Sequence, residues 1–190
     1  FNIPAFLIVM LLTVVLVRGI RESARTNNIM VLVKIGAILL FIFFGLSFIH
    51  PANYTPFSPN GWNGIVAGGS IIFFTYIGFD SVSTHAEEAK RPAHDVPVGI
   101  IASLLICTVL YILVAAVLTG MVPYKQISVD APVADAFKQH GLITAHYHVA
   151  AGALAGITSV LLVMMLSQPR VLLAMSRDGL LPVSCFGAFH

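Results

Sequence analysis

Long apolar runs separated by short polar segments are the feature that most constrains this chain. The runs fall near residues 3–17, 28–49, 64–86, 97–122 and 148–175. A helix needs about 20 apolar residues to cross a bilayer, and most of these runs reach that length. Only 9% of the residues are charged, against about a quarter in soluble domains. These features predict an all-α polytopic membrane protein with about five transmembrane helices and no large soluble domain.

The first run, residues 3–17, is short for a complete span. We therefore expect the chain to begin inside a helix of a longer protein and to be a fragment of one transmembrane domain. The run has no basic start, so it does not have the pattern of a cleavable signal peptide. Two cysteines, Cys107 and Cys185, do not make a disulfide framework.

The placement of lysine and arginine predicts the orientation. Seven of the ten basic residues lie at the trailing ends of the first, third and fifth runs or in the loops after them. Basic residues are enriched on the cytoplasmic side, so these ends are expected there. Lys125 and Lys138 lie on the opposite, outer side, and Lys34 lies within the membrane.

Several local signals predict where helices begin and end. Residues 131–140 have the pattern of a short amphipathic outer helix, capped by Asp130 and ended by Gly141. Asn27 and Asn28 are expected to cap the second span. Pro97 is expected to open the fourth.

The third run carries a glycine and an acid at membrane depth, Gly78 and Asp80. An ionisable residue there is a functional hypothesis by default. One interpretation is an intact helix in which Asp80 pairs with a base on a neighbouring helix. The other is an unwound segment, because Gly78 lowers the cost of leaving the helix and Asp80 can bond freed backbone groups. We favour the break, because broken membrane helices hold solutes in secondary transporters.

The end of the first half-helix, near residues 74–77, then has a chemical preference. Its terminal carbonyls carry partial negative charge and would attract a cationic group such as an ammonium. Aromatic side chains are dense around the break: Phe73, Phe74, Tyr76 and Phe79. Some of them must serve helix packing, and those that face the break could cover a bound solute.

Lys34, in the second run, has two open interpretations. Its amine can extend along the helix to the cytoplasmic interface. Alternatively it is a buried lysine that gains and loses a proton near neutral pH, because desolvation disfavours its charged form.

Other candidates give weaker signals. His146 and His148 could bind a metal, but two histidines in a loop are more often interfacial. Thr158 and Ser159 ordinarily bond the helix backbone, although hydroxyls can also line an ion site. Gly152 and Gly156 form a pair that lets another helix approach closely. We find no phosphate loop, nucleophile elbow or zinc spacing, so neither an enzyme, a metal, a cofactor nor a nucleic-acid partner is expected.

Four spaced stretches resemble the amino acid–polyamine–organocation superfamily, and most of all its cationic amino acid transporter branch in bacterial form. They are Arg18–Asn28, Phe74–Asp80, Glu87–Pro92 with Asp95–Pro97, and Gln168–Arg170 with Ser176–Pro182. The resemblance covers the whole chain and implies a partial leucine-transporter-like fold. It places the five runs at transmembrane helices four to eight, with the third run as the discontinuous sixth helix.

The resemblance also implies residue roles. Carbonyls around Phe74 and Ile77 would hold the substrate α-ammonium under the Phe74 ring, and Gly78, Phe79 and Asp80 would complete this half of the substrate site. Lys34 resembles the lysine that replaces a sodium ion in proton-coupled members. Thr158 and Ser159 would help line that position.

The implied function is amino acid transport, coupled to protons as a symport and working by alternating access. Its partners would be an amino acid, protons and the lipid of a bacterial inner membrane that the protein crosses several times. The resemblance places the glycine-rich first helix outside this chain, so the fragment alone is not expected to be active. A membrane sensor or subunit of the same fold, which binds amino acids without moving them, is the alternative.

Overall fold

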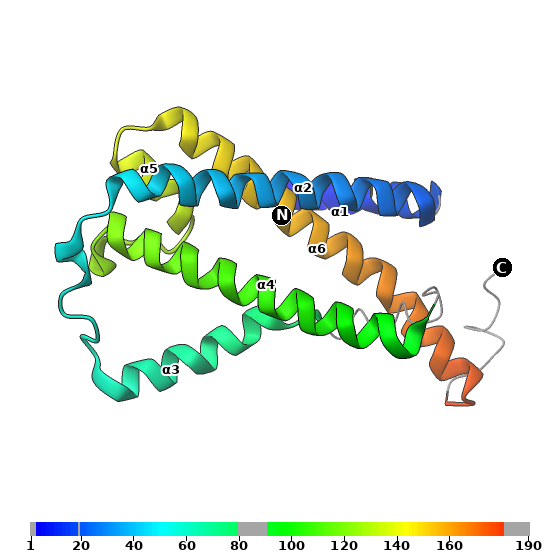
Figure 1. Cartoon of the computed structure of the whole chain (residues 1–190). Coiled ribbons are helices and arrows are strands. Elements are labelled where there is room, and N and C mark those ends of the chain that lie inside the picture. The colour runs from blue at the N-terminus through cyan, green and yellow to red at the C-terminus, as the bar shows by residue number, and fades with distance from the viewer. Residues whose placement is uncertain (1–2, 19, 80–90, 181–190) are drawn as a thin grey trace. The chain divides into compact units, whose positions relative to one another are not determined.

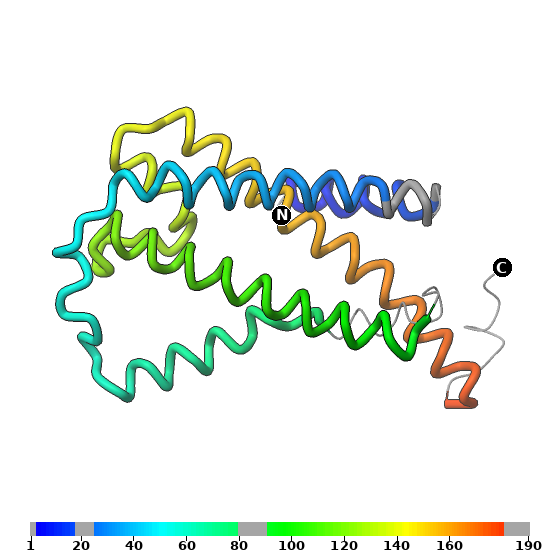
Figure 2. The backbone as a smooth tube through the Cα atoms, viewed as in Figure 1, coloured from blue at the N-terminus to red at the C-terminus, as the bar shows by residue number. Residues whose placement is uncertain are grey.

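The computed structural model describes residues 3–18, 20–79 and 91–180, with only the backbone for residues 18 and 20–24 (Figure 2). Every regular element among them is a helix, which confirms the all-α prediction. The α-helices are α1 Ile3–Arg18, α2 Ile20–Gly45, α3 Gly61–Phe73, α4 Pro92–Met121, α5 Pro132–Gln139 and α6 Ile143–Arg177 (Figure 1). Short 3₁₀ turns are Leu46–Phe48, Pro51–Tyr54, Phe74–Tyr76 and Tyr124–Gln126.

Three helical segments are long and apolar enough to cross a membrane: Arg25–Phe48, Pro92–Met121 and Ile143–Arg177. Two of the expected spans contain shorter helices, α1 with 16 residues and α3 with 13. At 1.5 Å per residue, α3 rises about 20 Å, less than the roughly 30 Å of a bilayer's hydrocarbon core. Much of the trailing part of that expected span, residues 80–86, lies outside the described residues.

Helix starts differ from the predicted ones. Asn27 and Asn28 lie inside α2, so their prediction as caps was wrong. The segment before them contains helix-forming residues, and the helix continues through it. Helix α4 begins at Pro92, with Pro97 in its interior, and the Asp95 carboxylate accepts the N–H of Arg91 at 3.3 Å at this start. Proline fits the first helical position because the N–H that it lacks would have no helical partner.

The described chain divides into two compact units. The first contains Phe1–Ile29, Gly78–Ile101 and Thr158–His190, and the second contains Met30–Ile77 and Ala102–Ile157. In the first unit, Leu12 is fully buried and Gly179 ends α6 with a φ of 77°. The second unit holds most of the features described below.

The core of the second unit gathers where α2 and α4 end, α5 lies and α6 begins (Figure 1). The Phe41 and Phe137 rings meet edge to face there, with centroids 5.4 Å apart. The buried residues are Phe41, Val117, Met121, Val122, Ala134, Ala136, Phe137 and Val149. One end of each of three membrane segments is thereby joined in this core, and it is the end that the basic-residue pattern predicts to lie outside.

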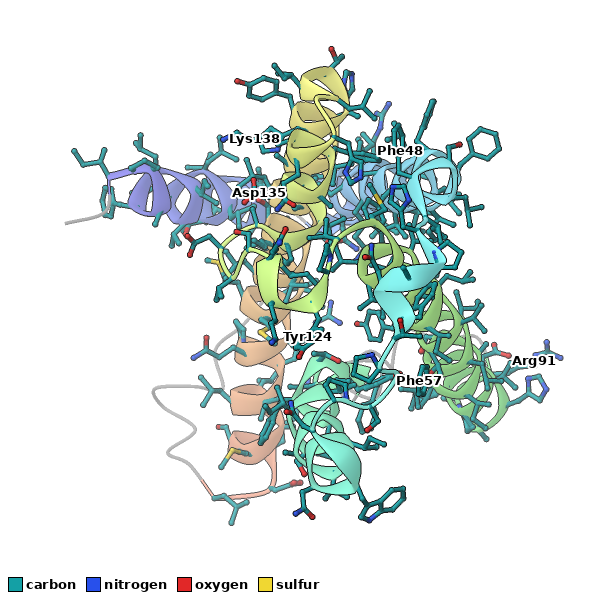
Figure 3. The ribbon with its side chains drawn as sticks, turned by 90° about the vertical axis from the view of Figure 1, so that its left-hand side faces the viewer. Phe48, Phe57, Arg91, Tyr124, Asp135 and Lys138 are labelled. Carbon is teal, nitrogen blue, oxygen red and sulfur yellow. The ribbon has the colours of Figure 1, made fainter. Side chains whose placement is uncertain are left out.

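Helix α5 has one buried and one polar face. Pro132 begins it and Gly141, with a φ of 76°, follows its C-terminal cap, as predicted. The predicted cap Asp130 was wrong, because Pro132 is the first helical residue and the capping position falls on Ala131. On the polar face, Asp135 and Lys138 are labelled in Figure 3, and they help to line a shallow hollow of about 400 Å³.

The loop between α2 and α3 is anchored on α4. The His50 N–H and the Asn53 side-chain amide both donate to the carbonyl of Gly120, at 3.0 and 2.7 Å. The Tyr54 hydroxyl donates to the carbonyl of Ala116 at 2.8 Å. A side chain at Gly120 would collide with the Tyr54 hydroxyl and lie 3.0 Å from Ile49 Cγ2. The close approach of loop and helix therefore depends on a glycine.

We expect Gly120→Ala to lower the free energy of unfolding by about 1–3 kcal/mol, because the added methyl must displace the Tyr54 ring. Thermal unfolding of the full-length protein in detergent measures the effect. Gly68→Ala is the matched control, since nothing lies within 4 Å of a methyl added to that helical glycine. Equal melting temperatures for the two variants would contradict the prediction.

Candidate functional site

Helix α3 ends inside its apolar run, at the place where the sequence predicts a break. The α-helix stops at Phe73 and continues as a 3₁₀ turn to Tyr76. Ile77 then has an extended ψ of 131°, and Gly78 has a φ of 120° that favours glycine. The first half of the predicted discontinuous helix is therefore in place. Asp80, the acid of the predicted site, lies outside the described residues.

Two of the last carbonyls of this half-helix accept hydrogen bonds outside the regular α-helical pattern. The Phe74 carbonyl accepts the Ile77 N–H at 3.3 Å. The Ile72 carbonyl accepts the Thr75 hydroxyl at 2.7 Å. Carbonyls at a helix C-terminus carry a partial negative charge of about half an elementary charge in total. This end can therefore attract a cation.

The apolar side chains predicted around the site are not enclosed by the described part of the chain. Phe74 is 68% exposed, Ile77 55% and Phe79 42%. A solute held at this end would need further walls, which is consistent with a half-site.

Two residues of α4 contact the break and were missed by the sequence analysis. The Tyr111 hydroxyl donates to the Thr75 carbonyl at 3.3 Å. The Tyr76 hydroxyl lies 2.9 Å from the Thr108 hydroxyl, and the Tyr76 and Tyr111 rings meet edge to face at 5.3 Å. The signal in the sequence was weak, because this run has four hydroxyl residues and nothing in the spacing of Thr108 and Tyr111 sets them apart from Ser103 and Thr119.

Lys34 lies half-buried on α2, beside the glycine face of α6. A methyl added to Gly156 would lie 3.7 Å from Lys34 Cδ. A methyl added to Gly152 would collide with Ala37, one turn along α2. The prediction that the two glycines let another helix approach closely is confirmed. The aliphatic stem of Lys34 passes over Gly156.

Thr158 and Ser159 follow on the same helix. Ser159 is 3% exposed and Thr158 is half-buried. The spacing of Gly152, Gly156 and Ser159, at i, i+4 and i+7, puts them on one helix face. Lys34 belongs to the second compact unit and both hydroxyl residues to the first, so their common ion site stays a prediction.

Both histidines place Nδ1 at a backbone carbonyl. Both lie in the first turns of α6 rather than in a loop. His146 Nδ1 lies 2.9 Å from the Ala134 carbonyl, and His148 Nδ1 lies 2.7 Å from the Thr144 carbonyl. In the part of the chain that the structure describes, no three histidine, cysteine or acidic residues gather as a metal site would require.

Replacement by alanine is expected to destabilise the protein at Gly152 and to be tolerated at Gly156. Gly152→Ala is expected to lower the free energy of unfolding by about 1–3 kcal/mol, because its methyl must push α2 and α6 apart. Gly156→Ala is expected to be tolerated, because its methyl meets Lys34 at an ordinary contact distance. Melting temperatures of the two full-length variants check this, and the reverse order would contradict the described packing.

Comparison with known proteins gives one family, whose members similar to this chain are named for different substrates. The amino acid permease family matches residues 2–188. The methylthioribose transporter of Bacillus subtilis is 48% identical over 182 residues, which are 96% of this chain and 40% of that protein. The branched-chain amino acid permease BcaP of the same organism is 49% identical over 185 residues, 97% of this chain and 40% of that protein.

A plant protein matches equally well. The chloroplastic cationic amino acid transporter 9 of Arabidopsis thaliana is 46% identical over 189 residues, which are 100% of this chain and 33% of that protein. The chain thus spans less than half the length of these relatives.

Proposed function

Because the chain belongs to the amino acid permease family, we propose that the full-length protein moves an amino acid across a membrane by alternating access, coupled to protons as a symport. Membership places the chain among multi-pass membrane transporters rather than enzymes. The observation that carries the proposal is the end of α3, where the helix stops inside its apolar run and its last carbonyls accept hydrogen bonds outside the regular α-helical pattern. Irregular backbone at membrane depth is tolerated where it is protein-buried or lines a cavity.

In this proposal the end of α3 binds the α-ammonium of the substrate. The carbonyls around Phe74 and Ile77 supply partial negative charge, and the Phe74 ring covers the ammonium. Gly78 allows the turn that separates the two half-helices. Phe79 and Asp80 lie just past it and complete this half of the site. The substrate carboxylate is held by a helix that the family resemblance places outside this chain.

Lys34 is the proposed proton site. Its aliphatic stem lies on Gly156, at the contact between α2 and α6. Thr158 and Ser159, further along α6, offer hydroxyl oxygens as acceptors for the charged form. An ionisable residue inside a membrane protein commonly marks a proton or ion pathway, and an ammonium can occupy a position that a sodium ion takes in related transporters.

The substrate class rests on two of the three relatives reported above. Their names include a branched-chain amino acid permease and a cationic amino acid transporter, and the α-ammonium is common to both substrate types. We propose that the protein belongs to the cationic amino acid transporter branch in bacterial form and works in the inner membrane. Its basic helix ends would face the cytoplasm.

Uptake by the full-length protein in proteoliposomes tests the proposal. Labelled L-arginine and L-leucine are offered with an acid-outside pH gradient, and a protonophore and protein-free liposomes serve as controls. Gradient-driven uptake of either amino acid supports proton-coupled transport. Binding without uptake or counterflow would identify a sensor instead. If labelled methylthioribose, which has no ammonium, were transported and neither amino acid were bound, the ammonium site would be wrong.

A further inference from the structure

We propose that Thr108 and Tyr111 of α4 are positioning residues for the break in α3, and that they fix Thr75 and Tyr76 so that the turn is confined to Ile77 and Gly78. The inference rests on the proposed function, in which the break binds the substrate ammonium. It adds two residues of another helix to that site.

The first contact satisfies a backbone group of the break. Thr75 lies at the end of the helix, where a carbonyl has no regular N–H partner four residues on. The Tyr111 hydroxyl donates to this carbonyl at 3.3 Å. In lipid an unsatisfied backbone group is costly, so the phenol stabilises the helix end in the broken conformation.

The second contact has a defined direction. The Thr108 hydroxyl donates its one proton to the carbonyl of Leu104 at 2.7 Å. In the 2.9 Å bond between the two side chains, the Tyr76 hydroxyl must therefore be the donor. The bond to the Leu104 carbonyl thus orients the Thr108 hydroxyl so that its oxygen accepts the proton of the Tyr76 hydroxyl. The edge-to-face contact of the Tyr76 and Tyr111 rings joins the two bonds into one cluster.

The cluster limits where the backbone can turn. Thr75 and Tyr76 are tied to α4 by one hydrogen bond each, whereas the next two residues have the irregular angles, ψ 131° at Ile77 and φ 120° at Gly78. The boundary between the two compact units also falls between Ile77 and Gly78. The carbonyl end of the half-helix therefore keeps one direction relative to α4, which is what a preorganised ammonium site requires.

Three variants of the full-length protein test the inference. Tyr111→Phe removes the phenol oxygen and keeps the ring, and Thr108→Val removes the acceptor at nearly constant shape. Thr108→Ser keeps the hydroxyl and should rescue. The dissociation constants of labelled L-arginine and L-leucine are measured in detergent, with melting temperatures in parallel. We expect a rise of about 3–10-fold for the first two variants, the size of one lost hydrogen bond, and a matching rise in KM for uptake.

Tyr54→Phe is the matched control, because it removes another tyrosine-to-carbonyl bond on the same helix, at Ala116. It should lower the melting temperature without changing either dissociation constant. Unchanged binding in Tyr111→Phe, or equal weakening in Tyr54→Phe, would overturn the inference. If the wild-type protein binds neither amino acid, the proposed function fails. If it binds and Gly78→Ala loses binding while Tyr111→Phe does not, only the positioning role fails.

Discussion

Lys34→Ala is expected to reduce the initial rate of the uptake that a pH gradient drives by about tenfold or more. The proposed cycle needs a group on α2 that is charged in one state and neutral in another, and alanine removes that group. Counterflow at equal pH, which requires no net proton movement, should be retained in part. Uptake of labelled amino acid into proteoliposomes, with and without the gradient, measures the loss.

Two further variants separate charge from proton exchange at this position. Lys34→Arg keeps a permanent positive charge that is not released near neutral pH, and it should also lose gradient-driven uptake. Lys125→Ala removes an exposed lysine from the segment between α4 and α5 and should behave as the wild type. Full gradient dependence in Lys34→Ala would show that the proton is carried elsewhere.

Gly78→Ala is expected to weaken substrate binding and uptake by about one to two orders of magnitude. A side chain at a φ of 120° strains the backbone by about 1–3 kcal/mol, and each 1.4 kcal/mol is a factor of ten in an equilibrium. The strain would be relieved by moving the turn, which displaces the carbonyls proposed to bind the ammonium. The dissociation constant of the labelled amino acid is the direct measurement.

Gly69→Ala makes the same chemical change within α3, before the break. That glycine has a helical conformation and nothing within 4 Å of an added methyl, so its variant should bind and transport normally. If Gly78→Ala bound substrate with wild-type affinity, the break would not be the ammonium site.

The sequence was sufficient for features that depend on local chemistry. Apolar length predicted the membrane segments of α2, α4 and α6. A glycine in an apolar run predicted that α3 would end near Gly78, because no other residue fits a positive φ so readily. Two glycines four residues apart predicted the close approach of another helix to α6, and the structure identifies that helix as α2.

Features that depend on distant residues could not be predicted in the same way. The role of Tyr111 is decided by the position of Thr75, 36 residues earlier, and a tyrosine in an apolar span has no pattern that reveals a partner. The expected caps Asn27 and Asn28 were wrong because the segment before them also forms helix. Side-chain oxygens suit a cap only where the helix in fact begins.

The anchored loop between α2 and α3 has a consequence for biosynthesis. Its donors Asn53 and Tyr54 find their acceptors 67 and 62 residues later in the chain. At roughly 5–20 residues per second, the ribosome needs several seconds to make that stretch. These two hydrogen bonds must therefore wait until α4 has been synthesised and has entered the membrane. The loop is therefore anchored late, and α4 is the segment whose insertion supplies its acceptors.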